Sequence, residues 1–320
     1  MEPTLSICIP TYNRFLILKD SIEEIIPFGF EKNIEICFSN NASTDETDYF
    51  LSNLSHKYQN VKYNLQSTNK GIDQNMIDVI NMATAEYILP LGDDDKLIIE
   101  NLDVLLSLLL DKPDIVILNG FHDKNEHLPE DLTSRYFDNP NIAFENLWDK
   151  MPFGSFVFKN ELINQQYFDK YLNTSHAYTG FIWESLYDKY SLSNSILIIC
   201  LKNPIITFKT EIKTWKDDTF KIMFYEIPKW FDLLSDKYPI IIHNNIMKNY
   251  LENMVRLNVL LSYRANGYLS KETANQYSDY YSSYYKRKIF IITYVPQFFA
   301  KFCLHSSIKV KDIIKWIIRW

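Results

Sequence analysis

The first 120 residues alternate short apolar runs with segments of helical periodicity, and this alternation restricts the fold more than any other feature of the chain. Two parallel strands need a crossover of about a dozen residues between them, which a helix usually supplies. The alternation therefore predicts an α/β chain with a mostly parallel central sheet flanked by helices. The expected strands are 5–9, 34–38, 61–65, 87–91 and 114–118, and the expected helices are 15–26 (ending at Pro27), 47–58, 72–85 and 97–110.

The pattern changes twice further along the chain. Beyond residue 120 it is less regular, and apolar runs predict strands at 153–158, 196–201 and 205–208. After Asp217 the periodicity becomes mostly helical, with helices expected at 221–234, 241–263 and 271–285. We therefore expect one domain over 1–210, in two halves of 1–120 and 121–210, followed by a helical region over 211–320.

The composition excludes several classes of protein. Hydrophobic residues make up 47% of the 320 residues and glycine is scarce at 7, which excludes collagen-like and linker-rich chains. A net charge of −7 argues against a nucleic-acid partner. The four cysteines lie far apart without a metal-binding pattern, so we expect Cys8 and Cys37 to be buried core thiols.

Targeting and membrane-spanning signals are not evident in the sequence. The start of the chain has no basic leader ahead of its apolar stretch, and no apolar run reaches the roughly 18 residues that a membrane span needs. We therefore expect a cytoplasmic protein.

The end of the chain is basic, whereas the rest is acidic. Residues 286–320 contain eight Lys or Arg and one acid, Asp312. Within 310–319 the isoleucines share one helical face and the charged side chains share the other. Such a tail suits the surface of an anionic membrane, where it would make the protein peripheral. Packing of the apolar face on the protein body is the alternative.

Polar clusters follow three of the predicted strands. They are Thr11-Tyr12-Asn13, Asn40 to Asp45, and Asp93-Asp94-Asp95. In open α/β sheets, ligands bind beyond the carboxyl ends of the strands. We therefore expect these three clusters to line one binding site.

Three adjacent acids at 93–95 repel one another unless a cation lies between them. Mg²⁺ and Mn²⁺ prefer carboxylate oxygens and leave positions open for a diphosphate. The alternative is a solvated acidic turn in which Asp95 caps the helix that begins near Leu97. The position directly after a strand favours the metal site.

Four motifs, in order, resemble the family 2 glycosyltransferases of GT-A fold. They are SICIPTYNR at 6–14, NNASTD at 40–45, NKGIDQN at 69–75 and EYILPLGDDD at 86–95. The resemblance covers about residues 3–120 and is weak beyond 150. The Gly-Asp-Asp-Asp form is similar to the branch that acts in O-antigen and capsule assembly.

The resemblance implies a GT-A fold and an inverting, metal-dependent transfer of the hexosyltransferase type. A sugar would move from a nucleotide-sugar donor to a saccharide or polyprenyl-linked acceptor in bacterial surface polysaccharide or lipooligosaccharide synthesis. In this interpretation residues 1–120 bind the donor and 121–210 form the acceptor side. Such a protein would work in the cytoplasm, at the inner face of the membrane.

The resemblance also assigns residues. Asp94 is the first choice as a ligand of Mn²⁺ or Mg²⁺, with Asp95 as a helper and Asp93 near the ribose and diphosphate. Tyr12 would stack on the base. The full set assigned to the nucleotide sugar is Pro10, Thr11, Tyr12, Asn13, Arg14, Asn40, Asn41, Lys70, Gly71, Gln74 and Asp93.

Two residues depart from the family pattern. Asn40 stands where the family usually has a base-reading Asp, so a UDP-sugar is the first expectation and CDP- or GDP-sugars stay open. Gln74 stands where many relatives have an Arg near the phosphates, which leaves their charge to the metal and Lys70.

An inverting transfer needs a base that takes the proton of the acceptor hydroxyl. Family 2 enzymes commonly place an acid for this purpose at the start of a helix. Glu184 fits that place, with Asp188 one helical turn later, and His176 is the alternative.

Other functions remain to be weighed against this one. A nucleotidyltransferase would carry a Gly/Arg/Lys-rich phosphate loop after the first strand, and a dehydrogenase would carry GxGxxG there; the chain has neither. A degenerate GT-A domain, kept as a binding or scaffolding module, stays open because of Asn40 and Gln74.

Overall fold

The computed structural model describes residues 2–122, 124–209, 218–234, 236–281 and 283–305. The chain divides into two compact units, Met1–Ile212 and Lys213–Trp320. Each unit has a hydrophobic core of its own. The tail helix predicted within 310–319 lies outside the described residues.

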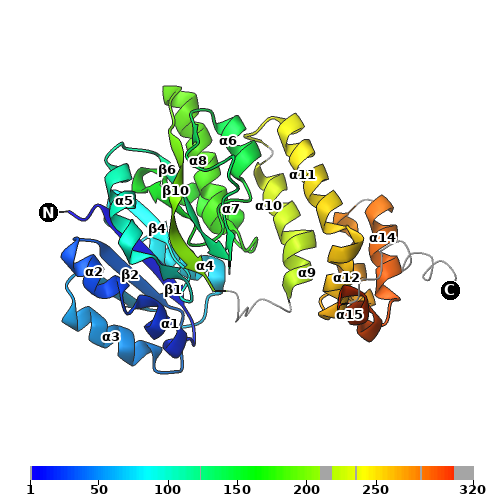
Figure 1. The fold of residues 1–320 in the computed structure, drawn as a ribbon, viewed down its shortest axis with the longest axis horizontal. Coiled ribbons are helices and arrows are strands. Elements are labelled where there is room, and N and C mark those ends of the chain that lie inside the picture. The colour runs from blue at the N-terminus through cyan, green and yellow to red at the C-terminus, as the bar shows by residue number, and fades with distance from the viewer. Residues whose placement is uncertain (1, 123, 210–217, 235, 282, 306–320) are drawn as a thin grey trace. The chain divides into compact units, whose positions relative to one another are not determined.

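A twisted sheet forms the centre of the first unit (Figure 1). Its strands lie in the order β3-β2-β1-β4-β9-β6-β10-β5, with β7 beside β6 and β8 beside β10. Pairing is parallel except around β9 and at the short strands β5, β7 and β8. The strands are β1 Leu5–Thr11, β2 Glu35–Asn40, β3 Val61–Leu65, β4 Tyr87–Pro90, β5 Lys96–Leu97, β6 Ile115–His122, β7 Asn125–Glu126, β8 Tyr136–Phe137, β9 Phe156–Lys159 and β10 Ile198–Phe208.

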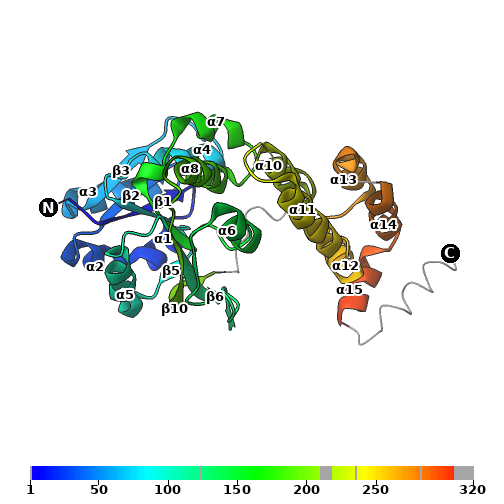
Figure 2. The ribbon, with the colours of Figure 1, turned by 90° about the horizontal axis from the view of Figure 1, so that it is seen from above.

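Helices cover both faces of this sheet, as the view from above shows (Figure 2). Helices α1, α2 and α5 lie on one face with α3, and α4, α7 and α8 lie on the other. The predicted α/β fold with a mostly parallel sheet is therefore confirmed. The helices are α1 Phe15–Ile22, α2 Ile25–Glu31, α3 Thr47–Lys57, α4 Ile72–Ile80, α5 Ile99–Leu109, α6 Pro140–Leu147, α7 Gln165–Tyr171 and α8 Ala177–Ser193, with a 3₁₀ turn at Asn160–Leu162.

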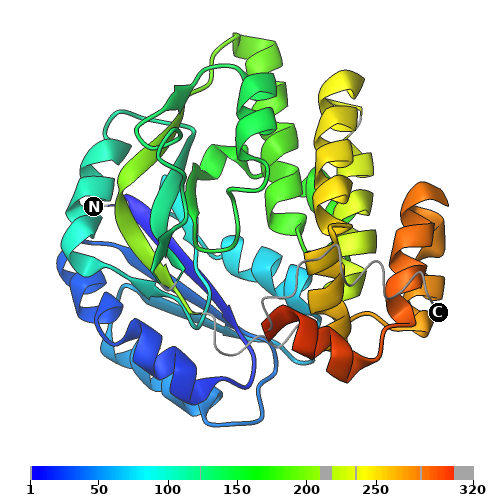
Figure 3. The same cartoon turned by 45° about the vertical axis from the view of Figure 1, so that its right-hand side comes forward.

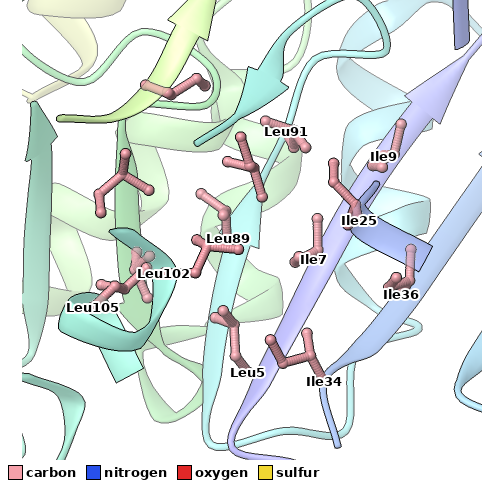
Figure 4. Packing of buried hydrophobic residues seen from close by; sticks show 14 of the residues in the cluster. Leu5, Ile7, Ile9, Ile25, Ile34, Ile36, Leu89, Leu91, Leu102 and Leu105 are labelled. Carbon is pink, nitrogen blue, oxygen red and sulfur yellow. The ribbon is translucent and has the colours of Figure 1, made fainter. Parts of the chain in front are cut away.

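One hydrophobic core cluster of the first unit lies between the sheet and helices α1, α2, α3 and α5 (Figure 4). Side chains of β1, β2 and β4 meet those of α5 there, because alternate residues of each strand point to the same face. Cys8 and Cys37 are fully buried, as predicted. The labelled residues of this core are Leu5, Ile7, Ile9, Ile25, Ile34, Ile36, Leu89, Leu91, Leu102 and Leu105.

Several elements differ from the sequence predictions, among them the predicted helix 271–285, which is divided between α13 (Lys271–Gln276), a 3₁₀ turn and α14 (Ser283–Thr293). Pro27 lies inside the first turn of α2 instead of ending a helix, because N–H groups of a first turn need no intrahelical acceptor. The runs 196–201 and 205–208 belong to one strand, β10, whose register shifts between Cys200 and Ile206. The helix expected to start at Glu184 starts instead at Ala177, as α8, and α6 and α7 were not predicted.

The second unit is helical (Figure 3, yellow to red). The predicted helix 241–263 is divided into two by Val255 and Arg256. Within the described part of the chain, none of the helices has both the length and the apolar character to cross a membrane. The elements are α9 Thr219–Lys221, a π-helical turn Ile222–Glu226, α10 Ile227–Leu234, α11 Ile240–Met254, α12 Leu257–Ala265, α13 Lys271–Gln276, a 3₁₀ turn Ser278–Tyr280, α14 Ser283–Thr293 and α15 Gln297–His305.

Candidate functional site

Hydrogen bonds join the loops that follow β1 and β2. The N–H of Asn13 donates to Ser43 Oγ at 2.8 Å, and the N–H of Thr44 donates to Asn13 Oδ1 at 2.7 Å. Asn13 and Ala42 have positive φ angles of 52° and 61°, which tight loops of this kind require. The two polar clusters therefore lie side by side, as the sequence predicted from their places after neighbouring strands.

Asn41 ties the loop ahead of α4 to the loop after β2. Its Oδ1 accepts from the N–H of Lys70 at 2.9 Å. Its Nδ2 donates to Asn69 Oδ1 at 2.9 Å and to the carbonyl of Gly71 at 3.2 Å. Together these loops form one hydrogen-bonded rim, which comprises residues 11–14, 40–45 and 69–71.

Arg14, directly before α1, bridges two of the three adjacent acids. Its Nη1 lies 2.5 Å from Asp93 Oδ1, and its Nη2 lies 2.8 Å from Asp94 Oδ2. Thr11 Oγ1 donates to the other oxygen of Asp93 at 2.8 Å. A planar guanidinium suits two carboxylates at once, because its N–H groups point outward in a fixed fork. The acid loop is thus attached to the rim.

The acids are buried to different degrees. Asp93 and Asp95 are 5% and 7% exposed, whereas the side chain of Asp94 is 23% exposed. Burial raises the pKa of Asp93 to about 6, despite the opposing effect of Arg14, and raises the pKa of Asp95 to about 7. The alternative of a solvated acidic turn is therefore wrong. Arg14 offsets part of the repulsion between the three carboxylates, whose relief the sequence alone attributed entirely to a bound metal.

Two carboxylate oxygens converge beside Gly92. A Cβ at this residue would lie 2.6 Å from Asp95 Oδ2 and 3.2 Å from Asp94 Oδ1. The second oxygen of each acid has another partner: Asp94 Oδ2 accepts from Arg14, and Asp95 Oδ1 accepts from the N–H of Lys209 at 3.2 Å. Asp95 therefore does not cap α5, which begins at Ile99. Glycine leaves space next to the converging oxygens.

This oxygen pair fits the predicted Mn²⁺ or Mg²⁺. Mg²⁺ is usually held by one or two carboxylates, and phosphates of the substrate and waters complete its shell. Nowhere in the described ranges do three or more His, Cys, Asp or Glu side chains gather as a complete metal cage. Asp94 and Asp95 are the residues that fit, because both oxygens of Asp93 are already engaged by Thr11 and Arg14.

Two side chains predicted to lie near the phosphates, those of Lys70 and Gln74, contact Asp78. Lys70 Nζ pairs with Asp78 Oδ2 at 3.1 Å, and Gln74 Nε2 donates to Asp78 Oδ1 at 2.9 Å. The Lys70 side chain is 40% exposed, so this ion pair is weak and leaves the ammonium free to turn. In this structure both side chains therefore lie against Asp78 of α4.

The predicted base contacts differ in accessibility. Asn40 is 0% exposed, and its Oδ1 accepts from the N–H of Ser43 at 2.9 Å. Pro10 is likewise buried within β1. Tyr12 is 42% exposed on the rim, where a planar base can stack on its ring. Tyr12 is therefore the better placed of these residues to meet a nucleotide.

Glu184 is not at the start of a helix, contrary to the sequence prediction. It lies within α8, two turns after Ala177, and is 1% exposed. Its Oε1 is paired with Lys170 Nζ and accepts from the Tyr171 hydroxyl. Asp188, one turn later, accepts from the hydroxyl of Tyr167. Both acids therefore join α7 to α8.

His176 occupies the N-cap position of α8 and is half-buried. Its Nδ1 lies 3.1 Å from the carbonyl oxygen of Thr174. Because a carbonyl can only accept, Nδ1 carries the proton and Nε2 is the basic nitrogen. The imidazole ring stacks beside Tyr178, with 6.1 Å between the ring centroids.

Asp73, in the first turn of α4, fixes the turn that leads into α8. Its Oδ2 accepts from the N–H groups of Thr174 and Ser175, both at 3.2 Å. Burial raises the pKa of Asp73, while these backbone N–H groups act in the opposite direction. Sequence reasoning missed this residue, since an acid in a first helical turn normally indicates only a favourable helix dipole.

The start of α8 and the acid loop lie along the same edge of the sheet. A Cβ at Gly154 would lie 3.2 Å from Asp95 Oδ2. The preceding residue, Phe153, packs edge-on against Tyr178 with 5.2 Å between ring centroids. The segment that holds His176 is thus connected to the acid loop through Phe153 and Gly154.

Comparison with known proteins identifies the family of the chain. The model of the family described as "Glycosyl transferase family 2" matches residues 6–172. The chain is 29% identical over 181 residues to abequosyltransferase RfbV of Salmonella typhimurium. That match covers 55% of this chain and 50% of the relative. It is 27% identical over 193 residues to the GalNAc(5)-diNAcBac-PP-undecaprenol beta-1,3-glucosyltransferase of Campylobacter jejuni. That match covers 59% of this chain and 61% of the relative. The matches thus span about half to three fifths of these curated relatives.

Solved structures share the fold. TarS 1-349 of S. aureus, in complex with UDP, has a TM-score of 0.57 at 14% identity, covering 91% of this chain and 90% of that chain. The mannosyltransferase PcManGT from Pyrobaculum calidifontis, in complex with GDP-Man and Mn²⁺, has a TM-score of 0.52 at 14% identity, covering 92% and 87%. The predicted GT-A fold with a helical C-terminal region is confirmed.

The Arg14 bridge predicts a pH-dependent loss of stability in Arg14→Met. Without the guanidinium, the buried Asp93 keeps its charge at a cost of about 3 kcal/mol of unfolding free energy at pH 8. The pKa of Asp93 in the folded protein, already raised to about 6, should rise further above that of the unfolded chain. Stability is then retained at low pH and lost as pH rises through the folded pKa.

Urea unfolding at pH 5.5 and pH 8 measures this effect. Lys19→Met, which removes an exposed charge from α1, is the matched control and should change little at either pH. Equal losses of stability for Arg14→Met at both pH values would contradict the account.

Proposed function

Because this chain belongs to glycosyl transferase family 2, we propose that it transfers a sugar from a nucleotide-sugar donor to a saccharide or lipid-linked saccharide. Its relatives are named as transferases of abequose and glucose, so we propose a reaction in bacterial surface polysaccharide synthesis. The observation that carries the proposal is the convergence of Asp94 Oδ1 and Asp95 Oδ2 beside Gly92. This convergence occurs at the sheet edge where the rim loops meet.

In the proposed site Asp94 and Asp95 hold Mn²⁺ or Mg²⁺ against the diphosphate of the donor. A divalent cation there would neutralise the charge that develops on the departing nucleoside diphosphate. Arg14 keeps Asp93 and Asp94 in place, and Lys209 fixes Asp95 through its backbone N–H. The metal-bound solved neighbour, PcManGT with Mn²⁺, supports this assignment by analogy of fold.

The nucleoside is proposed to lie along the rim against Tyr12. Asn40 would shape the loop beneath it through Ser43, because its side chain is fully buried. A UDP-sugar is the first candidate and a GDP-sugar the second, since the solved neighbours carry UDP and GDP-Man. A CDP-sugar completes the set that the sequence leaves open.

Among the predicted bases, the geometry favours His176 for an inverting transfer. It lies at the N-cap of α8, and the contact of Nδ1 with Thr174 makes Nε2 the nitrogen that can take a proton. Glu184 and Asp188 are engaged with α7. Asp73 would keep His176 in position by holding the backbone of the preceding turn.

The acceptor is proposed to be a saccharide on a polyprenyl carrier. The relative from Campylobacter jejuni is named for an undecaprenol-linked substrate. The reaction would then take place in the cytoplasm at the inner face of the membrane, with the protein bound peripherally.

A thermal-shift panel of UDP-, CDP- and GDP-sugars with and without Mn²⁺ tests the donor and the metal together. One donor with Mn²⁺ should stabilise the protein, by about 2.7 kcal/mol at a hundredfold excess over its dissociation constant. Asp94→Asn should remove the metal-dependent part of the shift, and Asp111→Asn, at an exposed acid of the same unit, should leave it intact.

The same shift should grow between pH 6 and pH 8. The pKa of Asp95 is raised to about 7, so protons compete with the metal below that pH. A donor that stabilises the protein but releases no nucleoside diphosphate in an activity assay would support a degenerate GT-A domain that only binds. A metal-dependent shift that persists in Asp94→Asn would contradict the metal assignment.

The base assignment predicts separate effects of two substitutions. His176→Gln should leave the donor-induced thermal shift unchanged and slow nucleoside diphosphate release by about 100-fold or more. Glu184→Gln should lower the melting temperature, because it removes a buried partner of Lys170, and should leave most of the turnover of the folded protein. The opposite pattern would assign the base to Glu184.

A further inference from the structure

The end of the second unit exposes a set of large apolar side chains. Tyr294, Phe298 and Phe302 are 69%, 74% and 57% exposed. We call these three residues, with Ile291, the α14–α15 ridge. Single exposed apolar residues are common on proteins, but several together along one short segment indicate an interaction surface.

Helix α15 explains why these side chains face outward. Phe298 and Phe302 are four residues apart and therefore share a helical face. Ala300 and Cys303, on the other face, belong to the buried core of the second unit. Because α15 turns its other face to the core, Phe298 and Phe302 are exposed.

Basic residues accompany the ridge. Residues 257–305 contain six Lys or Arg and two acids, Glu272 and Asp279, and of the six Arg264 donates to backbone carbonyls, those of Leu269 and Val295. Lys301 lies between the two phenylalanines in the sequence, and Lys271 Nζ lies 3.8 Å from the centroid of the Tyr294 ring. The surface therefore combines aromatic side chains with positive charge.

We propose that the α14–α15 ridge binds the surface of an anionic lipid membrane. Phenylalanine and tyrosine side chains enter the boundary between headgroups and acyl chains, and Lys and Arg pair with lipid phosphates. One weak signal rarely anchors a protein, whereas apolar insertion and basic attraction together do. Only described residues are needed for this surface.

Two other partners could cover the ridge, the last segment of this chain and a second copy of it, and charge argues against both. The segment that follows α15, residues 306–320, contains four Lys or Arg and one acid, so it carries the same sign as the surface it would cover. A second copy that docked through its own ridge would likewise bring positive charge to positive charge. Like charges brought together oppose association, whereas an anionic membrane supplies the complementary sign.

The inference deepens the peripheral membrane association contained in the proposed function. It requires no sugar transfer, so it can fail while the donor and metal assignments stand, and the converse also holds. A membrane site on this unit would keep the protein where a lipid-linked acceptor is found.

Co-sedimentation of the full chain with vesicles tests the proposal. The wild type should sediment with vesicles of phosphatidylglycerol and phosphatidylcholine, but not with phosphatidylcholine alone, and added salt should weaken the binding. The double variant Phe298→Ser/Phe302→Ser should bind at least about tenfold more weakly. Unchanged binding of this variant would overturn the proposal.

Two full-length controls accompany this variant. Tyr49→Ser/Leu192→Ser removes two side chains that are 76% and 90% exposed on the first unit, and it should bind as the wild type does. Lys309→Gln/Lys311→Gln/Lys315→Gln tests the last segment. If this variant lost binding while the phenylalanine variant kept it, the tail and not the ridge would be the membrane site, and the proposal would fail.

Sedimentation velocity without vesicles tests the second copy as an occupant. Wild type and Phe298→Ser/Phe302→Ser should both sediment with the mass of one chain. Their melting temperatures should agree, because the phenylalanines are exposed. A wild-type dimer that this variant dissociates would overturn the proposal by assigning the ridge to self-association.

Discussion

The contact of Arg14 with Asp93 and Asp94 is the interaction on which the site depends. The guanidinium lies across both carboxylates, and Ser21 of α1 donates to the backbone carbonyl of Asp93 at 2.8 Å. The acid loop after β4 is thereby held against α1 and the rim. With Asp93 committed to this contact, Asp94 and Asp95 are left to present one oxygen each beside Gly92.

The same edge of the sheet receives the start of α8 from the other half of the unit. Asp73 holds the turn at Thr174 and Ser175, although it belongs to α4 and the donor side. Phe153 and Tyr178 provide a second connection, toward Asp95. The geometry at His176 is therefore coupled to the loops proposed to bind the donor, which suits a reaction that needs both substrates in register.

The sequence predicted those parts of the fold and site that depend on local pattern. Apolar strands followed by polar clusters located β1, β2 and β4 and the loops after them, because parallel strands bring their carboxyl ends together. Helix α8 gave no such signal: residues 177–186 are buried on all sides, so the 3.6-residue periodicity of a half-buried helix is missing. The partners of Glu184 and Arg14 come from other elements, and a single sequence does not show such contacts.

The central claim is that Asp94 and Asp95, and not all three acids, face the cation. A crystal structure with UDP and Mn²⁺, collected at the manganese absorption edge, measures this directly. We expect an anomalous peak beside Gly92 within bonding distance of the Asp94 and Asp95 carboxylates, with Arg14 still on Asp93. A peak ligated by Asp93 with Arg14 displaced, or a peak away from this loop, would contradict the account.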